Sequence, residues 1–464
     1  MKPPYIAKLM NLLIKNGTLV TAEKTEKADI LVSGEKIERV APEIKQVQGA
    51  VREIDATGRL VIPGGLDPHV HMHLPTPAGF SADDFESGSR AALIGGTTTM
   101  IDFVTPRKGQ QLTQALDERL AEASSSLIDF SLHVSPVEWH QKLEDEITNC
   151  LKRGIRSFKV YMAYLETIGL TDDVLEKVLA ILGKHGAMLT VHAEVGAEIE
   201  RLRNGFFESG KTEPLFHALS RPPHTEAEAV KKVLAMAKKA NCQVYLVHIS
   251  AAASLSHIEA AQSDGQHVFA ETCPQYLLLN DLAYDKKLER ALPFVMSPPL
   301  RKKVDNEALW KALAKGTIQS TGTDHCPFNL EQKLLGKDDF RKIPNGAGGV
   351  EHRLALLYTF GVREKRISLN RWVDICSATP AKIFGLFPRK GSLEPGTDAD
   401  IVIWNPEIRQ TISAKTHHQR CNINVFEGVK TIGGPEYVIA AGKLAVQKGA
   451  LSNEGLKGRF LKQC

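Results

Sequence analysis

The middle of the chain alternates short apolar runs with longer segments in which apolar residues recur every three or four positions. The longer segments, such as residues 112–123, 170–186 and 224–240, have the periodicity of amphipathic helices. The apolar runs are typical of buried strands and comprise residues 60–71, 96–104, 126–135, 155–163, 187–194, 243–250, 267–274 and 318–325. Strands that alternate with helices form a parallel sheet. A doubly wound sheet would also hold such units, but eight of them favour a (β/α)₈ barrel.

Both ends of the chain alternate apolar and polar residues, as antiparallel strands do. These segments comprise residues 12–20, 28–40, 399–406 and 436–451. Predicted hairpin turns lie at Asn16-Gly17, Gly34-Glu35 and Gly442-Lys443. Because each end is too small for a core of its own, we expect the two ends to pack together as one small β-sandwich. The predicted fold class is therefore α/β, with residues 1–62 and 391–464 forming the sandwich and residues 63–390 the TIM-like barrel.

Composition narrows the class of protein. The 464 residues are 43% hydrophobic and 24% charged, with a net charge of +4, as in an ordinary globular protein without a basic patch for nucleic acid. Seven scattered cysteines without a CxxC motif favour reduced thiols. The N-terminal apolar stretch is short and is interrupted by Lys8 and Lys15, so it predicts neither a membrane span nor a leader. We expect a cytoplasmic protein that binds neither nucleic acid nor membrane.

Polar residues interrupt the apolar runs near their carboxyl ends, where a barrel carries its catalytic groups. They are His69 and His71 on the first run, Lys159 on the fourth, His192 on the fifth, His248 on the sixth and Asp324 on the eighth. A single histidine of this kind is more often a hydrogen-bonded core or rim residue than a ligand. Burying the whole set would cost several kcal/mol without partners, however, and histidine and carboxylate are the usual ligands of zinc. We interpret the set as a metal centre.

Lys159 is the unusual member, because its amine lies inside an apolar strand. Desolvation lowers the pKa of such an amine. A neutral amine can add carbon dioxide to form a carbamate, whose two oxygens could bridge two metal ions. The alternative is that Lys159 forms an ion pair with an acidic neighbour.

The chemistry-bearing motifs resemble those of the amidohydrolase superfamily: DxHxH at residues 67–71, the lysine of FKVYMAY, the histidines of VHAE and VHIS, and the aspartate of GTDH. A narrower resemblance is to the dihydropyrimidinase and hydantoinase family of cyclic-imide hydrolases. It rests on HALSRPP (217–223), ETCPQYLL (271–278), SPPLR (297–301) and IPNGAGGVEHR (343–353). The resemblance extends from about residue 15 to residue 461.

The resemblance implies a role for each matching residue. His69, His71 and Asp324 would bind the more buried of two divalent ions, expected to be zinc. His192 and His248 would bind the second, and N6-carboxylated Lys159 would bridge both. The substrate-binding residues would be Tyr164, which contacts the substrate carbonyl, and Ser297 and Asn345, whose main-chain groups hold the imide and amide edges of the ring.

The resemblance also implies an activity. A hydroxide shared by the ions would attack the ring of a 5,6-dihydropyrimidine or a 5-substituted hydantoin, and Asp324 would pass the proton to the leaving nitrogen. The small-molecule product would be an N-carbamoyl amino acid, and the enzyme would be a homotetramer. Allantoinase and a non-catalytic scaffold of the same fold are the alternatives. A dihydroorotase is disfavoured, because no arginine follows the HxH pair in HVHMHLP.

Several nearby residues have alternative interpretations. His73 occupies a place where the resemblance leads us to expect an acidic residue or an amide, and we favour a rim residue over a third ligand. Asp67 is expected either to orient a ligand or to shape the loop at the Asp-Pro step. His325, which neighbours Asp324, should face away from the site. His217 and His224 are expected to be structural or to lie near an interface, and Cys273 and Cys326 are expected to be bystanders.

Overall fold

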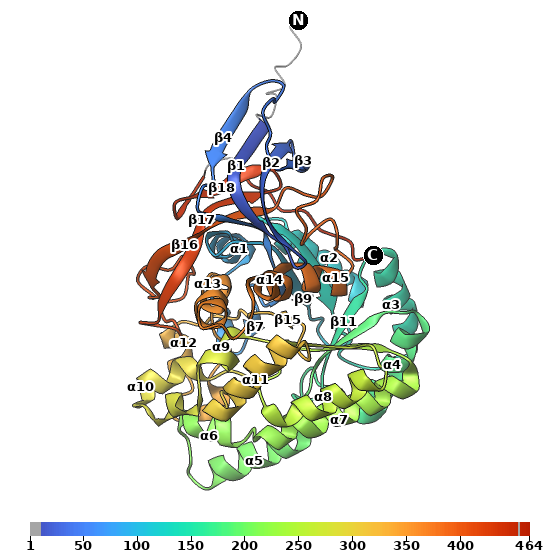
Figure 1. Cartoon of the computed structure of the whole chain (residues 1–464). Helices are drawn as coiled ribbons and strands as arrows, with labels where there is room; N and C mark the ends of the chain where they lie inside the picture. Colours follow the sequence, from blue (N-terminus) through green and yellow to red (C-terminus); the bar gives the residue numbers. More distant parts are fainter. Residues whose placement is uncertain (1–10, 453–454) are drawn as a thin grey trace, which may run out of the picture.

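The computed structural model describes residues 11–452 and 455–464, and an eight-stranded parallel sheet lies at its centre (Figure 1). Its strands are β6 (Gly65–Val70), β9 (Thr97–Val104), β10 (Asp129–Val134), β11 (Ser157–Tyr161), β12 (Met188–His192), β13 (Gln243–Leu246), β14 (Val268–Thr272) and β15 (Ser320–Thr321). Asp324 N donates to His69 O at 2.9 Å and His71 N donates to His325 O at 2.8 Å. These bonds join the segment after β15 to β6, so the predicted barrel is confirmed.

The helices follow the strands in the order that the periodicity predicts. They are α1 (Phe85–Ile94), α2 (Leu112–Ala123), α3 (Leu143–Lys152), α4 (Asp172–Lys184), α5 (Gly196–Glu208), α6 (Pro214–Leu219), α7 (Pro223–Ala240), α8 (Ala252–Ser263), α9 (Pro274–Leu278), α10 (Leu288–Ala291), α11 (Lys303–Lys315), α12 (Leu330–Leu334), α13 (Arg353–Leu357), α14 (Leu369–Val373) and α15 (Thr379–Ile383). Short 3₁₀ or π segments are η1 (Asp281–Asp285), η2 (Leu292–Phe294), η3 (Phe340–Lys342), η4 (Tyr358–Arg363) and η5 (Asp374–Ala378). The three helices predicted by range correspond to α2, α4 and α7. In α7, residues Val230, Val233, Leu234 and Ala237 form the buried stripe that covers the barrel.

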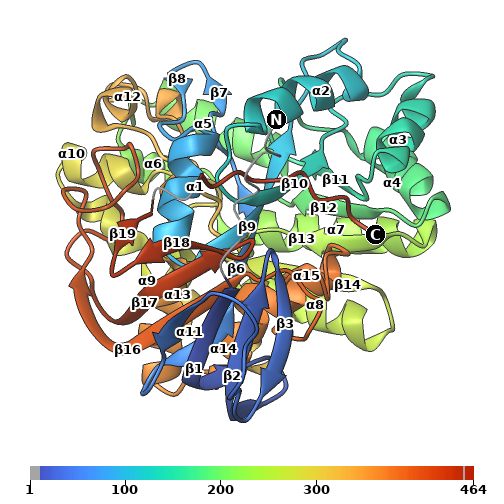
Figure 2. The same ribbon diagram turned by 90° about the horizontal axis from the view of Figure 1, so that it is seen from above.

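The two ends of the chain form a second sheet, drawn in blue and red in Figure 2. Its strands are β1 (Asn11–Val20), β2 (Thr25–Ser33), β3 (Lys36–Ala41), β4 (Val51–Asp55), β5 (Leu60–Pro63), β16 (Ile401–Thr411), β17 (Lys430–Ala440), β18 (Lys443–Gln447) and β19 (Ala450–Leu451). The order is β19-β18-β17-β16-β5-β1-β2-β3, with β4 on β1, so the strands form one mixed sheet. Apolar side chains from both ends, among them Ile14, Ile30 and Ile401, share one buried cluster. The predicted association of the two ends is confirmed.

Three details of the sequence prediction need correction. The run at residues 60–71 is two strands, because β5 pairs with β16 and the chain enters the barrel only at β6. Gly64 makes this passage possible, since a Cβ there would lie 2.1 Å from Thr98 Oγ1. Asn16-Gly17 is a bulge inside β1 and not a hairpin turn. The turn after β17 lies one residue early, at Ala441-Gly442. Gly34-Glu35 does connect β2 to β3.

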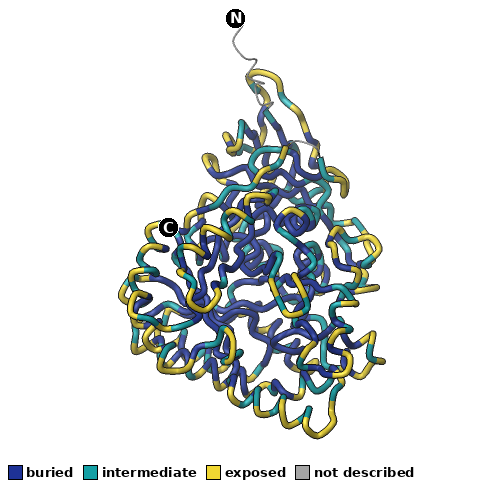
Figure 3. Tube along the Cα trace, turned by 180° about the vertical axis from the view of Figure 1, so that it is seen from behind, coloured by how far each residue is buried: buried dark blue, intermediate teal, exposed yellow. Residues whose placement is uncertain are grey.

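The C-terminal tail fills a gap at the amino end of the barrel strands. β10 and β11 pair only at Val134 and Phe158. In place of further pairing, Phe130 N donates to Arg459 O at 3.0 Å and Leu461 N donates to Phe130 O at 2.7 Å. The tail therefore serves as a short extra strand next to β10. Figure 3 shows buried backbone gathered in the middle of the molecule and exposed backbone along its outline.

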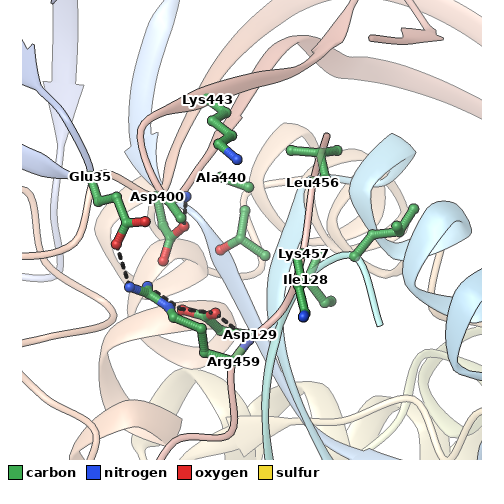
Figure 4. A pocket seen from close by; sticks show the side chains of 12 residues that line it. Glu35, Ile128, Asp129, Asp400, Ala440, Lys443, Leu456, Lys457 and Arg459 are labelled. Carbon is green, nitrogen blue, oxygen red and sulfur yellow. Dashed lines mark hydrogen bonds and ion pairs between the residues drawn. The ribbon is translucent and has the colours of Figure 1, made fainter. Parts of the chain in front are cut away.

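A buried ionic cluster connects the barrel, the terminal sheet and the tail. The carboxylates of Asp129, Asp398 and Asp400 lie close enough to hold a cation. Lys390 Nζ supplies that positive charge, at 2.7 Å from Asp129 Oδ2 and 3.0 Å from Asp398 Oδ2 and in contact with Asp400. Arg459 reaches from the tail to Asp129 and Glu35 (Figure 4). The cluster is an ionic connection between the parts of the fold and not a metal site.

None of the helices in the described part of the chain combines the length and apolar character needed to cross a bilayer. Residues 1–10, which contain Lys8 and part of the N-terminal apolar stretch, lie outside the described residues. The division of the chain at residues 62 and 390 stays a prediction.

Candidate metal centre and active-site cavity

A cavity of about 1270 Å³ opens at the carboxyl ends of the barrel strands. Strand and loop ends bring side chains far apart in sequence to its wall. Among its lining residues are all nine of the predicted site residues: His69, His71, Lys159, Tyr164, His192, His248, Ser297, Asp324 and Asn345. The structure therefore places the whole predicted set around one space that is large enough for a small ring substrate and its side group.

Three of these side chains converge on a single point. His69 Nε2 and His71 Nε2 lie 3.2 Å apart, and Asp324 Oδ1 lies 3.2 Å from the first and 3.1 Å from the second. Donors held about 2.0–2.2 Å from one zinc ion lie about 3–3.5 Å from one another. The spacing of this trio fits one divalent ion.

Glu271 fixes which nitrogen of His69 faces that point. His69 Nδ1 lies 2.8 Å from Glu271 Oε1, so it donates to the carboxylate and leaves Nε2 with a lone pair. Burial lowers the pKa of His69, but the carboxylates of Glu271 and Asp324 outweigh it and raise the pKa to about 9. Two carboxylates thus attract positive charge to this place, whether a proton or a metal ion.

His192 and His248 form a second pair next to the trio. His192 Nδ1 and His248 Nε2 lie 3.0 Å apart, and the His248 ring stacks on that of His69 with centroids 5.4 Å apart. His192 Nε2 donates to Glu194 Oε2 at 2.7 Å, and Glu194 in turn contacts Arg221. Nδ1 of His192 is therefore the nitrogen with the lone pair, and it faces His248. Burial, then the nearby His192, lowers the pKa of His248 well below its ordinary value, which keeps the ring neutral.

Lys159 is buried among the two histidine groups and the rings beside them. Its Nζ lies 5.0 Å from the ring centroids of both Phe103 and Tyr161. No ion pair to Lys159 occurs among the described residues, so the alternative of an acidic partner finds no support. Burial lowers the pKa of Lys159 to about 7, although the charges of Asp324 and Glu271 act in the opposite direction. A large share of the amine is therefore neutral near pH 7, the form that reacts with carbon dioxide.

The donor set as a whole fits a metal centre. Four imidazole rings and one carboxylate oxygen lie together here, and a desolvated amine lies beside them. Burial raises the pKa of Asp324, whereas His69 and His71 lower it. The histidines prevail, so the pKa lies well below its ordinary value and Asp324 is an anionic ligand. Nitrogen and oxygen donors of this kind suit zinc and similar divalent ions.

The remaining predicted residues occupy the wall of the cavity. The Tyr164 ring centroid lies 5.4 Å from that of His192, and the Arg221 guanidinium lies 5.2 Å from the Tyr164 centroid. Tyr164 has a φ of +61°, and its carbonyl accepts hydrogen bonds from the three consecutive amides of residues 167–169. Asn345 Oδ1 is buried without a protein partner among the described residues. The wall therefore combines a phenol carried on a fixed main chain with a buried amide oxygen free to meet a ligand.

Sequence reasoning missed two acidic residues that orient the ligands. Glu271 is the next-to-last residue of β14, the one late strand for which no polar group had been assigned, and Glu194 follows His192 by two residues. Both are fully buried. A signal was available, because ETCPQYLL places an acid at the carboxyl end of the seventh strand, where a barrel carries functional groups.

Asp67 holds the main chain that carries the ligands and does not touch a ligand ring. Its Oδ1 accepts from His69 N at 3.2 Å and from Thr323 N at 3.1 Å, and its Oδ2 accepts from Thr323 Oγ1 at 2.6 Å. It thereby connects β6 to the segment that contains Asp324. His325 is buried, faces away from the cavity and bonds to Asp83 Oδ2 at 3.1 Å, as the alternation predicts.

His73 lies at the rim and away from the three converging ligand atoms. Its Nδ1 lies 2.5 Å from Glu122 Oε1, and its ring stacks on Phe80 with centroids 4.0 Å apart. Cys326 also lines the cavity, whereas Cys273 is buried outside its lining. His224 is exposed against Glu198. The rim interpretation of His73 agrees with this placement.

The chain is similar to known enzymes over nearly its whole length. Residues 60–445 match the Amidohydrolase family. The D-hydantoinase of Geobacillus stearothermophilus is 41% identical over 457 residues, which cover 98% of this chain and 97% of that protein. The dihydropyrimidinase of Rattus norvegicus is 38% identical over 457 residues, or 97% of this chain and 88% of that protein.

Solved structures show the same similarity. The crystal structure of dihydropyrimidinase from Brevibacillus agri has a TM-score of 0.96 and 39% identity, and the match covers 98% of this chain and 99% of that one. Sequence and structure give the same result. The chain belongs to the amidohydrolase family and, within it, to the group of hydantoinases and dihydropyrimidinases.

Proposed function

We propose that the protein hydrolyses one amide bond of a cyclic imide or ureide, a 5,6-dihydropyrimidine or a 5-substituted hydantoin, to an N-carbamoyl amino acid. The observation that carries this proposal is the set of six ligand-type side chains around one cavity, next to the phenol of Tyr164. The D-hydantoinase and dihydropyrimidinase relatives support the choice of substrate class.

Two divalent ions, preferably zinc, are the proposed cofactors. His69, His71 and Asp324 would hold one, His192 and His248 the other, and Lys159 carboxylated on Nζ would contact both. Bound in this way, such ions supply a nucleophilic water at neutral pH and polarise the carbonyl group under attack. Glu271 and Glu194 support this arrangement, because each fixes the tautomer of one histidine.

The chain's own groups complete the reaction. Oxygen of a water molecule bonds to the ring carbonyl carbon, and the ring C–N bond breaks. Asp324, an anion at neutral pH, accepts the proton of that water and returns it to the departing nitrogen. The Tyr164 hydroxyl donates to the carbonyl oxygen as negative charge develops there. Main-chain groups of Ser297 and Asn345 hold the two edges of the ring.

A panel of ring substrates tests the proposal. Purified protein loaded with zinc and bicarbonate should open dihydrouracil, dihydrothymine or 5-substituted hydantoins, and a chelator should abolish the activity. Allantoin and dihydroorotate belong in the same panel. Preferred activity on allantoin would indicate the allantoinase alternative, and preferred activity on dihydroorotate would indicate the disfavoured dihydroorotase. The scaffold alternative predicts protein that leaves every ring intact, and that result in protein loaded with two ions would overturn the proposal.

Two further expectations accompany it. We propose a cytoplasmic enzyme that assembles as a homotetramer. Light scattering on the purified protein measures the mass of the assembly, and a monomer at micromolar concentration would contradict the proposed tetramer.

A further inference from the structure

Lys333 of α12 is a buried lysine that belongs to none of the groups described so far. Only 1% of its surface is exposed. Its Nζ donates to three main-chain carbonyls, at 2.8 Å to Val295 O, 3.0 Å to Pro344 O and 2.9 Å to Gly346 O. Within residues 11–452 and 455–464, no carboxylate forms an ion pair with it.

Three carbonyl acceptors match the three donors of an ammonium group. A neutral amine has only two N–H bonds and would turn its lone pair toward the third carbonyl. Burial lowers the pKa of Lys333 to about 7, but the three carbonyl dipoles favour the charged form. The chain thus places a costly ammonium in its interior and uses every donor to bind main chain, an arrangement that packing alone does not require.

The carbonyls bound by Lys333 lie beside the two segments that line one wall of the cavity. Val295 precedes Ser297 by two residues, and Pro344 and Gly346 flank Asn345 on both sides. Gly346 N also donates to Val295 O at 3.1 Å, so the two segments contact each other directly. One ammonium group therefore fixes both segments at once.

His217 restrains the first segment on its other side. Its Nε2 donates to Met296 O at 2.8 Å and lies 3.5 Å from Ser297 Oγ. Burial, together with the charge of Arg221, lowers the pKa of His217 to about 3, so the ring is a neutral donor at neutral pH. The segment before Ser297 is thus bound through consecutive carbonyls by two side chains from different helices.

We propose that Lys333 is a positioning residue for substrate binding: by bonding Val295, Pro344 and Gly346, it sets the separation of the main-chain groups of Ser297 and Asn345 that hold the ring. The inference rests on the proposed function in that it assigns the ring to these two segments. It adds that their spacing depends on one buried ammonium, remote from the ions and from the bond that breaks.

A series of substitutions at one position tests this inference. Lys333→Gln keeps two amide N–H donors, and Lys333→Met keeps none while filling similar space. KM for the best ring substrate should rise in the order Lys, Gln, Met, by about tenfold or more for Met, because each lost donor removes one of the hydrogen bonds that hold the two segments in place. Turnover number should change by less than about threefold, and the metal content should stay that of the parent protein.

Lys337→Met is the matched control, because Lys337 lies in the same segment, is exposed and carries the same charge. Its KM should equal that of the parent. Parent-like KM in Lys333→Gln and Lys333→Met would overturn the inference, and so would a loss of metal and turnover without a graded KM. If Lys333→Met does not fold, Lys333→Gln decides alone, and a parent-like KM there overturns the inference. A parent protein inactive on every ring would instead refute the proposed function.

Discussion

Glu271 Oε1 accepts a hydrogen bond from His69 Nδ1 at 2.8 Å, and the same oxygen accepts one from His248 N at 3.1 Å. One buried carboxylate thereby orients the ring of a residue in the trio and the main chain of a residue in the second pair. Its other oxygen accepts from Tyr245 OH at 2.8 Å. Glu271 is therefore the group through which the two halves of the proposed metal centre are held in register.

We expect Glu271→Gln to lower metal affinity and turnover by about 10–100-fold, the usual cost of removing a carboxylate behind a histidine ligand. The amide keeps the size of the side chain but loses the charge that favours the required His69 tautomer. Competition with a chromophoric chelator measures the affinity. Tyr245→Phe is the control, because it leaves the carboxylate in place and should have a smaller effect. Equal affinity in Glu271→Gln and the parent would contradict the assignment.

Lys159→Ala should remove bridged metal binding and lower turnover by about three orders of magnitude or more, because groups that act as a unit fail together. Elemental analysis and a ring-opening assay measure the two effects. Short carboxylic acids added to the variant should restore part of the activity by entering the space of the lost side chain. Two tightly held ions in the unrescued variant would show that Lys159 is not the bridge.

The site residues that could be predicted from the sequence are those that interrupt the apolar pattern of the strands. His69, His71, Lys159 and the later ligands stand out because apolar strands exclude polar groups, and because the barrel brings all strand ends together. Their roles, by contrast, came from the family resemblance. Glu271 and Glu194 were missed because an acid at a strand end also fits a solvated rim, and only burial distinguishes the two.

The fold could be predicted where the local periodicity of apolar residues determines an element. It was less predictable where the pairing partner of a strand determines its place. Eight strands and the helices between them follow from local pattern. The passage from β5 to β6 does not, since both are apolar and only pairing with β16 assigns the first to another sheet. Asn16-Gly17 has the composition of a hairpin turn, yet β1 continues through it because β2 pairs on both sides of the bulge.

Removing Lys390 should destabilise the fold without changing the cavity. Lys390→Met leaves Asp129, Asp398 and Asp400 buried near one another without their ammonium, and a broken buried pair costs about 3–5 kcal/mol. Denaturant titration measures the loss, and the folded fraction should keep the parent KM. Lys184→Met, which removes an exposed pair with Glu144, should leave stability unchanged. Equal midpoints for the two variants would refute the structural role of the cluster.

His217 should make the protein sensitive to acid. Burial first, then Arg221, lowers its pKa from 6.5 to about 3, so the folded state binds this proton less readily than the unfolded state. Its contribution is fully present above pH 6.5 and is lost as the pH falls from 6.5 toward 3, at a rate approaching about 1.4 kcal/mol per pH unit. The Gln side chain of His217→Gln still donates to Met296 O but does not titrate, so its unfolding free energy should fall less steeply than that of the parent between pH 6.5 and 4.5. His224→Gln, at an exposed position, should follow the parent curve. Parallel curves for all three proteins would show that His217 takes up no proton on unfolding in this range, and the donor role assigned to its neutral ring would fail with it.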